Sequence, residues 1–470
     1  MIKLSSIKAV YIPLLIVYFT TGLAGISAVT STVFFKDTIT LDAAVLISLG
    51  VYISLPWSIK MVFGSLIDSV RLFGNNRKSY IYLGQLLVFL GTVGMVDHVS
   101  TKFLISSLGE FTALLLSGLT ATIGVVISDV VADVMAIELV PEDDPDRDKN
   151  LGIVQVLSRL SLMFGGLLAA FVTGPLASTF SAATVYSLEL LCPAIAVVAT
   201  FLSPTQAAVE PSPVNRSLLL GGVGYGALTA VLGYFFDTDI VFLVSLSILS
   251  VMMFSLIRES FPVDKIKPFV YAMLAIFLFR TVPGIGPAGS WWYMNELGFD
   301  ADFMGVLRIV GSVAGFITLM FLADLITKHS IFRTMLVLTG LITILSLPDI
   351  LIFYNLTFGL SPRTLVLVDA AMIAPLAQLS MIPLGVLIAR NAPPASRAAY
   401  ISLTASLMNI SLVGGDVITK KLNEVFLVTR DDFTNLGELM IYSLLISTIF
   451  SIIGLVLLKI GGRDGHGQNN

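Results

Sequence analysis

Long apolar runs separated by short polar turns recur along the whole chain. Each run can fill the roughly 20 residues that a helix needs to cross a bilayer. The runs lie at about 9–35, 41–66, 80–98, 103–138, 150–173, 179–203, 217–235, 239–257, 268–294, 301–326, 331–354, 362–390, 396–423 and 436–460. The pattern predicts an all-α polytopic membrane protein with about fourteen spans.

The runs form two blocks of six with a pair between them. We expect an N-terminal six-helix bundle at 1–204, a linker with an inserted transmembrane hairpin at 205–262, a C-terminal six-helix bundle at 263–460 and a disordered tail at 461–470. The first and ninth runs end alike, in aromatic residues and a short polar turn before an acidic helix start. Parallel six-helix repeats are typical of the major facilitator fold, whose substrate site lies between the halves.

Composition agrees with a membrane protein. The chain is 56% hydrophobic and only 12% charged, whereas soluble proteins carry about 25% charged residues. With the N-terminus in the cytoplasm, seventeen Lys and Arg residues fall in inner turns and six in outer turns. The six outer residues are Lys36, Lys102, Arg363, Lys420, Lys421 and Arg430. The positive-inside rule therefore predicts a multi-pass protein of the plasma (inner) membrane with both termini cytoplasmic.

Several kinds of chemistry leave no trace in the sequence. We find no metal-ligand cluster, phosphate-binding glycine loop, nucleic-acid motif or convincing nucleophile–base pair. The single cysteine, Cys192, cannot form an intramolecular disulfide. We therefore expect a protein that is not an enzyme, holds no cofactor or metal and binds no nucleic acid.

The segment 55–80 places a lysine inside a hydrophobic run and closes the run with a basic turn. Lys60 is a functional candidate, because a charge in hydrocarbon is costly. The charges that follow can pair across the cytoplasmic face, and glycine lets helices approach closely. We expect an inner gate built from Gly64, Asp68, Arg71, Arg77 and, in the second half, Asp324.

Two acids and two bases share one layer of the inner half. Asp129 and Asp133 are four residues apart and therefore lie on one face of the fourth span. Arg159, in the next span, reaches a similar depth to Lys60. One interpretation is a set of interhelical salt bridges, above all between Asp133 and Arg159. The other gives Lys60 the anionic end of a substrate and gives Asp129 a proton or a substrate N–H group.

The ninth span contains an arginine just before a stretch that cannot hold a regular helix. Proline removes a donor and glycine loosens the backbone in Thr281-Val282-Pro283-Gly284, and broken helices at membrane depth are tolerated where they line a cavity. Arg280 is accordingly a candidate for substrate binding, or else a cap for the freed carbonyl groups of a packed kink.

Other polar residues inside the spans complete the set of candidates. Tyr18 and Thr21 occupy the region of the first span equivalent to Arg280, and Arg308 is a further buried cation; we predict that all three bind substrate. Asp133, Glu189 and Asp369 are candidates for carrying a coupling proton, since burial shifts the titration of a carboxyl. Trp291 and Trp292 are expected to belong to an interfacial aromatic belt.

Three groups of residues resemble one known family. They are Leu55-Pro56-Trp57-x-x-Lys60 with Gly64-x-x-x-Asp68-Ser69, Phe73-Gly74 and Arg77-Lys78-x-Tyr80; Asp129-Val130-Val131-x-Asp133 with Glu138; and Asn295-Glu296-Leu297-Gly298-Phe299 followed by the residues 305–312. The chain thereby resembles the folate–biopterin transporter family of the major facilitator superfamily. The resemblance implies transport of folate, a pterin or a related small organic anion.

Two functions of different classes fit these observations. The first is a monomeric secondary active transporter that works by alternating access as a proton symporter, with a folate- or pterin-like substrate and the lipid bilayer as its partners. The alternative is a membrane assembly or delivery factor that uses the same scaffold without transporting anything. Neutral substitutions of Lys60 and Arg280 would distinguish them, because only a transporter needs buried charges that bind substrate.

Overall fold

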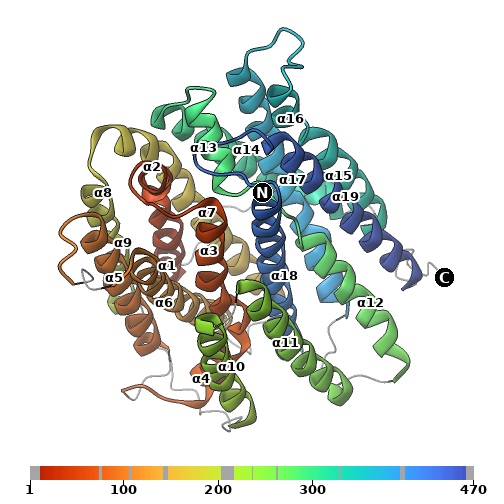
Figure 1. Cartoon of the computed structure of the whole chain (residues 1–470). Coiled ribbons are helices and arrows are strands. Elements are labelled where there is room, and N and C mark those ends of the chain that lie inside the picture. The colour runs from red at the N-terminus through yellow and green to blue at the C-terminus, as the bar shows by residue number, and fades with distance from the viewer. Residues whose placement is uncertain are drawn as a thin grey trace. The chain divides into compact units, whose positions relative to one another are not determined.

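The computed structural model describes residues 11–73, 77–104, 108–140, 147–202, 216–235, 237–260, 263–327, 330–391 and 397–461. Within these ranges every regular secondary-structure element is a helix, as Figure 1 shows. The predicted tail at 461–470 lies, apart from its first residue, outside the described residues.

The helices follow the predicted runs, and several runs contain a break. The first half holds α1 (Ile12–Leu23), the 3-10 turn η3 (Ala24–Ser27), α2 (Ala28–Asp37), α3 (Ala43–Ser58), α4 (Lys60–Ser69), α5 (Lys78–Val99), α6 (Glu110–Glu138), α7 (Arg147–Thr179), α8 (Ala182–Glu189) and α9 (Leu191–Leu202). The hairpin consists of α10 (Arg216–Phe235) and α11 (Thr238–Ser260).

The second half has the same character. It holds α12 (Val263–Arg280), α13 (Pro287–Asn295), α14 (Ala301–Thr327), α15 (Ile331–Leu345), α16 (Pro348–Phe353), α17 (Pro362–Asn391), α18 (Arg397–Val425) and α19 (Leu436–Ile460).

Two breaks are central to the arrangement of the charged residues. The second run bends by 40° between α3 and α4, one turn after Pro56, whose ring disturbs the helix around it. The ninth run is open between Arg280 and Pro287, where Gly286 has a φ of 66°. A residue with a β-carbon rarely adopts that angle, so glycine permits the chain to turn into α13 there.

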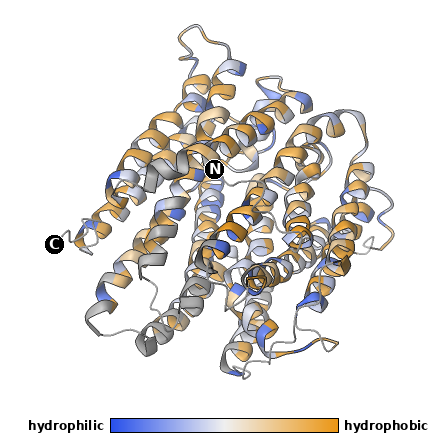
Figure 2. Ribbon diagram, turned by 180° about the vertical axis from the view of Figure 1, so that it is seen from behind, coloured by the Kyte–Doolittle hydropathy of each residue, from blue (hydrophilic) through white to orange (hydrophobic). Residues whose placement is uncertain are grey.

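The all-α membrane fold class is confirmed. Nine helices in the described part of the chain are long and apolar enough to cross a membrane, or ten if the bent pair α3 and α4 forms one span. Figure 2 shows hydrophobic residues along most of the described helix surfaces, and large apolar side chains such as Leu191, Phe201 and Val251 are exposed. The count of fourteen spans stays a prediction.

The expectation for the paired tryptophans is wrong. Trp291 is 1% exposed and Trp292 is 4% exposed, so both are buried within protein rather than placed for contact with lipid headgroups. The guanidinium of Arg430 lies 5.1 Å from the ring centre of Trp291, and the ring of Trp292 packs on Phe353 at 5.9 Å.

Contacts group the chain into two compact units that do not follow the order of the sequence. Unit 1 comprises Met1–Thr40, Val62–Gly221 and Asp300–Ser312, and unit 2 comprises Leu41–Met61, Gly222–Phe299 and Val313–Asn470. Within unit 2, α3 packs along α18 (Figure 1). Within unit 1, the first turns of α14 meet α7 at Gly174 and Gly305. The sequence-based division at 204 and 263 stays a prediction.

Candidate functional site

An arginine at the start of α5 connects the ends of three helices in unit 1. The Nη1 atom of Arg77 donates to Asp68 Oδ1 at 2.9 Å, while Nε and Nη2 donate to Glu138 Oε1 at 3.0 and 2.7 Å. Burial disfavours the charged guanidinium, but the two carboxylates outweigh that effect and raise the pKa of Arg77. The network therefore joins α4, α5 and α6 through charge-assisted hydrogen bonds.

The remaining predicted gate residues are placed differently. Gly64 faces Val130 of α6 at ordinary contact distance. Arg71 is exposed after the end of α4. Asp324 lies in α14, and its side chain is outside the described part of the structure. Glu138 was not among the predicted gate residues, although its position five residues beyond Asp133, near the end of the fourth run, could have suggested a partner for the basic turn.

The first span contributes a tyrosine to the acidic face of α6. The hydroxyl of Tyr18, which is buried, donates to Asp133 Oδ1 at 2.9 Å. No ion pair between Asp133 and Arg159 occurs among the described residues, and Arg159 is exposed on α7. Thr21 donates to the backbone carbonyl of Val17 at 3.0 Å, which is a local helix contact.

A half-buried glutamate ends α8, next to the broken first span. Glu189 Oε2 is buried and has no hydrogen-bond partner in the described structure. The neighbouring 3-10 turn η3 packs on α8, and one turn away Tyr186 shares a 2.6 Å hydrogen bond with Ser31 of α2. The described ion pairs do not include a cation for this carboxyl. A buried oxygen without a partner is costly, so this carboxyl stays a candidate for carrying a proton.

In unit 2, Lys60 begins the helix that follows the bend. Its Nζ atom lies 6.0 Å from the ring centre of Trp57, a cation–π contact. Asn409 of α18 donates to the Trp57 carbonyl at 2.9 Å, beside the break. Since α4 is continuous from Lys60 to Asp68, eight residues separate these side chains by about 12 Å along the helix.

Arg280 ends α12 at the second break. Its Nη1 atom donates to the Met381 sulfur at 3.1 Å, and its Nε is buried without a hydrogen-bond partner among the described residues. A thioether is only a weak acceptor. The guanidinium therefore retains donors that a carboxylate could use.

Side chains of two helices hold the open segment after Arg280. The Gly284 N–H donates to Thr419 Oγ1 of α18 at 2.8 Å, and Ser443 of α19 donates to the Pro283 carbonyl at 2.8 Å. One expectation was that Arg280 caps the freed carbonyl groups. For the Pro283 carbonyl, Ser443 is the partner instead. The backbone of Gly415 approaches Val282 so closely that a β-carbon would lie 2.7 Å from its carbonyl oxygen.

The two breaks lie at neighbouring levels along α18. Asn409 contacts Trp57 and Gly415 contacts Val282, and six residues of helix span about 9 Å. Lys60 comes three residues after Trp57 and Arg280 comes two residues before Val282, so both cations belong to segments that pack beside α18.

Three other predicted residues differ in how far they are exposed. Arg308 is exposed on α14, one turn beyond Gly305. Asp369 of α17 is half-buried. Asp129 is half-buried on α6, four residues before Asp133. The sequence did not predict the hydrogen bond that Tyr293 donates to Asp349 Oδ1 at 2.6 Å.

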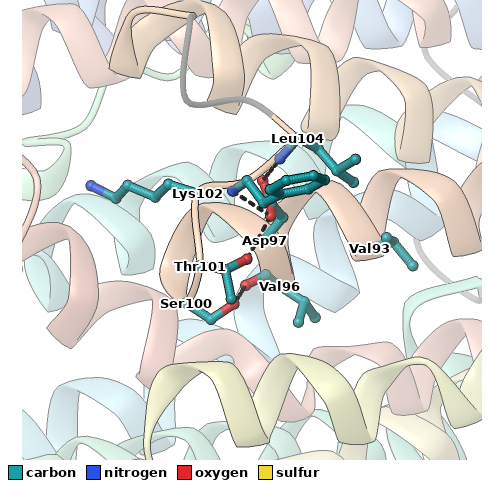
Figure 3. A pocket seen from close by; sticks show the side chains of 8 residues that line it. Val93, Val96, Asp97, Ser100, Thr101, Lys102 and Leu104 are labelled. Atoms are coloured by element: carbon teal, nitrogen blue, oxygen red, sulfur yellow. Dashed lines mark hydrogen bonds between the residues drawn. The ribbon is translucent and has the colours of Figure 1, made fainter.

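A shallow hollow at the end of α5 is a different kind of feature (Figure 3). The carboxylate of Asp97 accepts from Thr101 Oγ1 at 2.8 Å and from the N–H groups of Phe103 and Leu104 at 2.9 and 3.0 Å, while Lys102 points away. The Asp97 carboxylate thus stabilises the turn that follows α5, and we assign the hollow no role in binding.

Comparisons with known proteins place these sites in a transporter. The chain is 28% identical over 460 residues to the folate-biopterin transporter of Synechocystis sp., which covers 95% of this chain and 81% of that one. It is 22% identical over 443 residues to folate transporter 1 of Plasmodium falciparum, covering 92% and 76%. The names agree with the prediction of a transporter rather than an enzyme.

Solved structures confirm the fold. A POT family transporter in complex with a thioalcohol-conjugated peptide has a TM-score of 0.70 at 15% identity and covers 97% of this chain and 96% of that one. A D-xylose–proton symporter has a TM-score of 0.63 at 13% identity, covering 96% and 95%. These likenesses show the major facilitator fold alone. The sequence profile of the BT1 family matches residues 21–463, nearly the whole chain, and the protein therefore belongs to the BT1 family.

Proposed function

We propose that this protein carries folate, a pterin or a related organic anion across the membrane by alternating access, driven by protons. The names of the relatives supply the substrate class. The chemistry of the site agrees with it, because folate has a carboxylate tail for cations and a pterin ring whose N–H groups suit an aspartate. In this proposal Lys60, Arg280, Arg159 and Arg308 serve the anionic end, and Asp129, Tyr18 and Thr21 serve the ring.

The observation that carries the proposal is the guanidinium of Arg280. It stands at the break of a span, and among the described residues it donates a hydrogen bond to a thioether, that of Met381. A cation at membrane depth is costly, and a broken helix there is tolerated where it lines a cavity. Both features are explained together if an anionic substrate completes the site.

Uptake of radiolabelled folate into membrane vesicles tests the proposal. We expect accumulation in vesicles that contain the protein and its loss in Arg280→Met, because the anion would lose its charge-assisted hydrogen bonds. Arg333→Met is the matched control, since Arg333 is exposed at the start of α15. Absence of uptake of folate and of pterin by the unaltered protein would refute the substrate class. Equal uptake by both variants would refute the role of Arg280.

Among the three candidates for the coupling proton, Glu189 has the clearest support. Asp133 already accepts a hydrogen bond from Tyr18, whereas one oxygen of Glu189 is buried and unpartnered within the described structure. We expect Glu189→Gln to keep exchange of substrate down its gradient and to lose accumulation driven by a pH gradient. If the variant still accumulates substrate against its gradient, the proton is carried elsewhere, with Asp369 as the next residue to test.

The same proposal includes orientation and assembly. A monomer in the plasma membrane with both termini cytoplasmic places the Arg77 network at the inner face, where it closes the path when the substrate faces outward. Accessibility of single engineered cysteines in the 97–104 turn and in the 70–73 segment to an impermeant maleimide would test the orientation. We expect the reagent to label cysteines in the 97–104 turn from outside and cysteines in the 70–73 segment only after permeabilisation. The reverse pattern would overturn the proposed orientation.

A further inference from the structure

The tip of the inserted hairpin is joined to α18 by a group of five charged residues, all in unit 2. We call this group the outer ion cluster; it comprises Asp237, Asp239, Lys420, Lys421 and Glu424. The Lys420 side chain is only 3% exposed. Its Nζ atom bonds to Asp237 and donates to Thr238 Oγ1 at 2.9 Å and to Asp239 Oδ1 at 3.3 Å. A buried ammonium with three donors is thus satisfied almost wholly by the hairpin turn.

Lys421 provides a contrast on the same helix. It pairs with Asp239 Oδ2 at 2.5 Å and with Glu424 Oε2 at 2.8 Å, but its side chain is 46% exposed. Water can replace the partners of Lys421 and cannot readily replace those of Lys420. The cluster therefore depends on the buried lysine, and the exposed one is a matched control.

The turn of α18 that carries Lys420 also holds the break after Arg280. Thr419, next to Lys420, accepts the hydrogen bond from the Gly284 N–H at 2.8 Å. Asn423, three residues further on, reaches the Ile285 carbonyl at 3.4 Å. The same turn thus contacts the hairpin through one side chain and the open segment through two others.

The hairpin tip also contacts α3. The hydroxyl oxygens of Ser48 and Thr238 are 3.4 Å apart, and the backbone at Gly233 lies against the ring of Tyr52. The hairpin therefore meets both helices of the α3–α18 pair, whose other contacts include the Trp57–Asn409 hydrogen bond beside Lys60.

We propose that Lys420 is a positioning residue for substrate binding: by joining the hairpin turn to α18, it fixes the turn that holds the broken segment after Arg280. The inserted hairpin is then a working part of the transporter and sets the geometry of the anion site. This inference rests on the proposed function for its substrate. It predicts that loss of the acidic partners loosens the segment 281–286 and weakens substrate binding without abolishing transport.

Transport kinetics with radiolabelled folate test the inference. We expect the double variant Asp237→Asn with Asp239→Asn to raise KM about tenfold, a loss of about 1.4 kcal/mol, with the maximal rate per folded protein nearly unchanged. Lys420→Met should behave alike, Lys421→Met should match the unaltered protein, and exchanging the charges in Lys420→Asp with Asp237→Lys should recover much of the affinity. An unchanged KM in the double variant would overturn the proposal.

A second readout does not depend on the substrate. Amide hydrogen exchange of residues 281–290 in the purified protein should become faster in the double variant, because the N–H of Gly284 reports on its bond to Thr419, while exchange in α5 and α6 should not change. Unchanged exchange at 281–290, or acceleration throughout the protein, would refute a positioning role. If the unaltered protein transports no folate, the proposed function fails, and the exchange experiment still decides the link between the hairpin and the break.

Discussion

A crossing of two helices in unit 1 leaves no room for a side chain. Gly174 of α7 faces Gly305 of α14, and a β-carbon built on Gly305 would lie 2.6 Å from the Gly174 Cα and 3.0 Å from its nitrogen. Carbon atoms in contact are normally about 3.5–4.0 Å apart. Gly305→Ala must therefore push the two backbones apart by about 1 Å, since neither neighbour is a flexible side chain.

The size of the effect follows from the rigidity of that contact. Inserting a methyl group into a well-packed site costs about 1–3 kcal/mol, which changes an equilibrium constant by a factor of about 5 to 150. Asp302, three residues before Gly305, accepts a hydrogen bond from Ser178 at 2.7 Å, and separation of the helices would stretch this bond too. In the proposed topology these are outer helix ends, so we expect the variant to favour the conformation that is open to the outside.

Labelling of an engineered cysteine measures this shift. Arg308→Cys places a thiol one turn inward of Gly305, and an impermeant maleimide added outside should label it at least about fivefold faster in the Gly305→Ala background. Gly174→Ala should act alike, since its β-carbon would lie 2.9 Å from the Gly305 Cα. Gly340→Ala is the control, because no atom lies within 4 Å of the added carbon. Unchanged labelling in both tight variants, or equal acceleration in the control, would refute the reasoning.

Three further predictions concern single polar groups. Arg77→Met should lower the free energy of unfolding by about 3–5 kcal/mol, because Glu138 would stay largely buried without its cation; chemical denaturation in detergent measures this loss, and a change below 1 kcal/mol would contradict it. Tyr18→Phe should raise KM for folate severalfold by removing the hydrogen bond to Asp133, since a typical hydrogen bond contributes about 0.5–1.5 kcal/mol, and an unchanged KM would exclude a role in binding. Burial disfavours the charged form of Asp237, yet its bonds to Lys420 and Thr238 lower its pKa. The stability that the ionised side chain contributes is therefore complete above about pH 4 and is lost as pH falls through the lowered pKa. The difference in melting temperature between the protein and Asp237→Asn should accordingly be constant from pH 5 to 8.

The apolar helices and the break after Arg280 could be read from the sequence because both depend on local properties. Apolar runs of membrane length predict helices, and the Pro283-Gly284 pair predicts an open segment, which the structure places between Arg280 and Pro287. The bend at Ile59 was not predicted, although Pro56 lies one turn before it. A proline near a helix end can be accommodated with or without a bend, and packing decides which.

The partners of the charged residues could not be read in the same way. Depth places Asp133 and Arg159 in one layer, but the rotation of each helix about its axis decides which side chains meet, and Tyr18 meets Asp133 instead. Lys420 and Lys421 appeared only as exceptions to the positive-inside bias. Two lysines that the predicted topology places on the outer side, against that bias, were a signal that they pair with acids, and the hairpin turn supplied the acids.

One helix in unit 2 determines the surroundings of both candidate cations. Along α18, Asn409 bonds beside Lys60, Gly415 lies against the chain after Arg280, and Thr419 holds the open segment, so successive turns support successive parts of the site. A displacement of α18 would therefore change both cationic positions together, and the two could not be tuned independently. Since Lys420 attaches this helix to the hairpin, loss of the outer ion cluster should weaken binding of a substrate that spans both cations more than binding of a fragment that reaches only one. Comparing folate with a pterin that lacks the carboxylate tail would reveal this difference, and equal losses for both would show that α18 does not act as a common support.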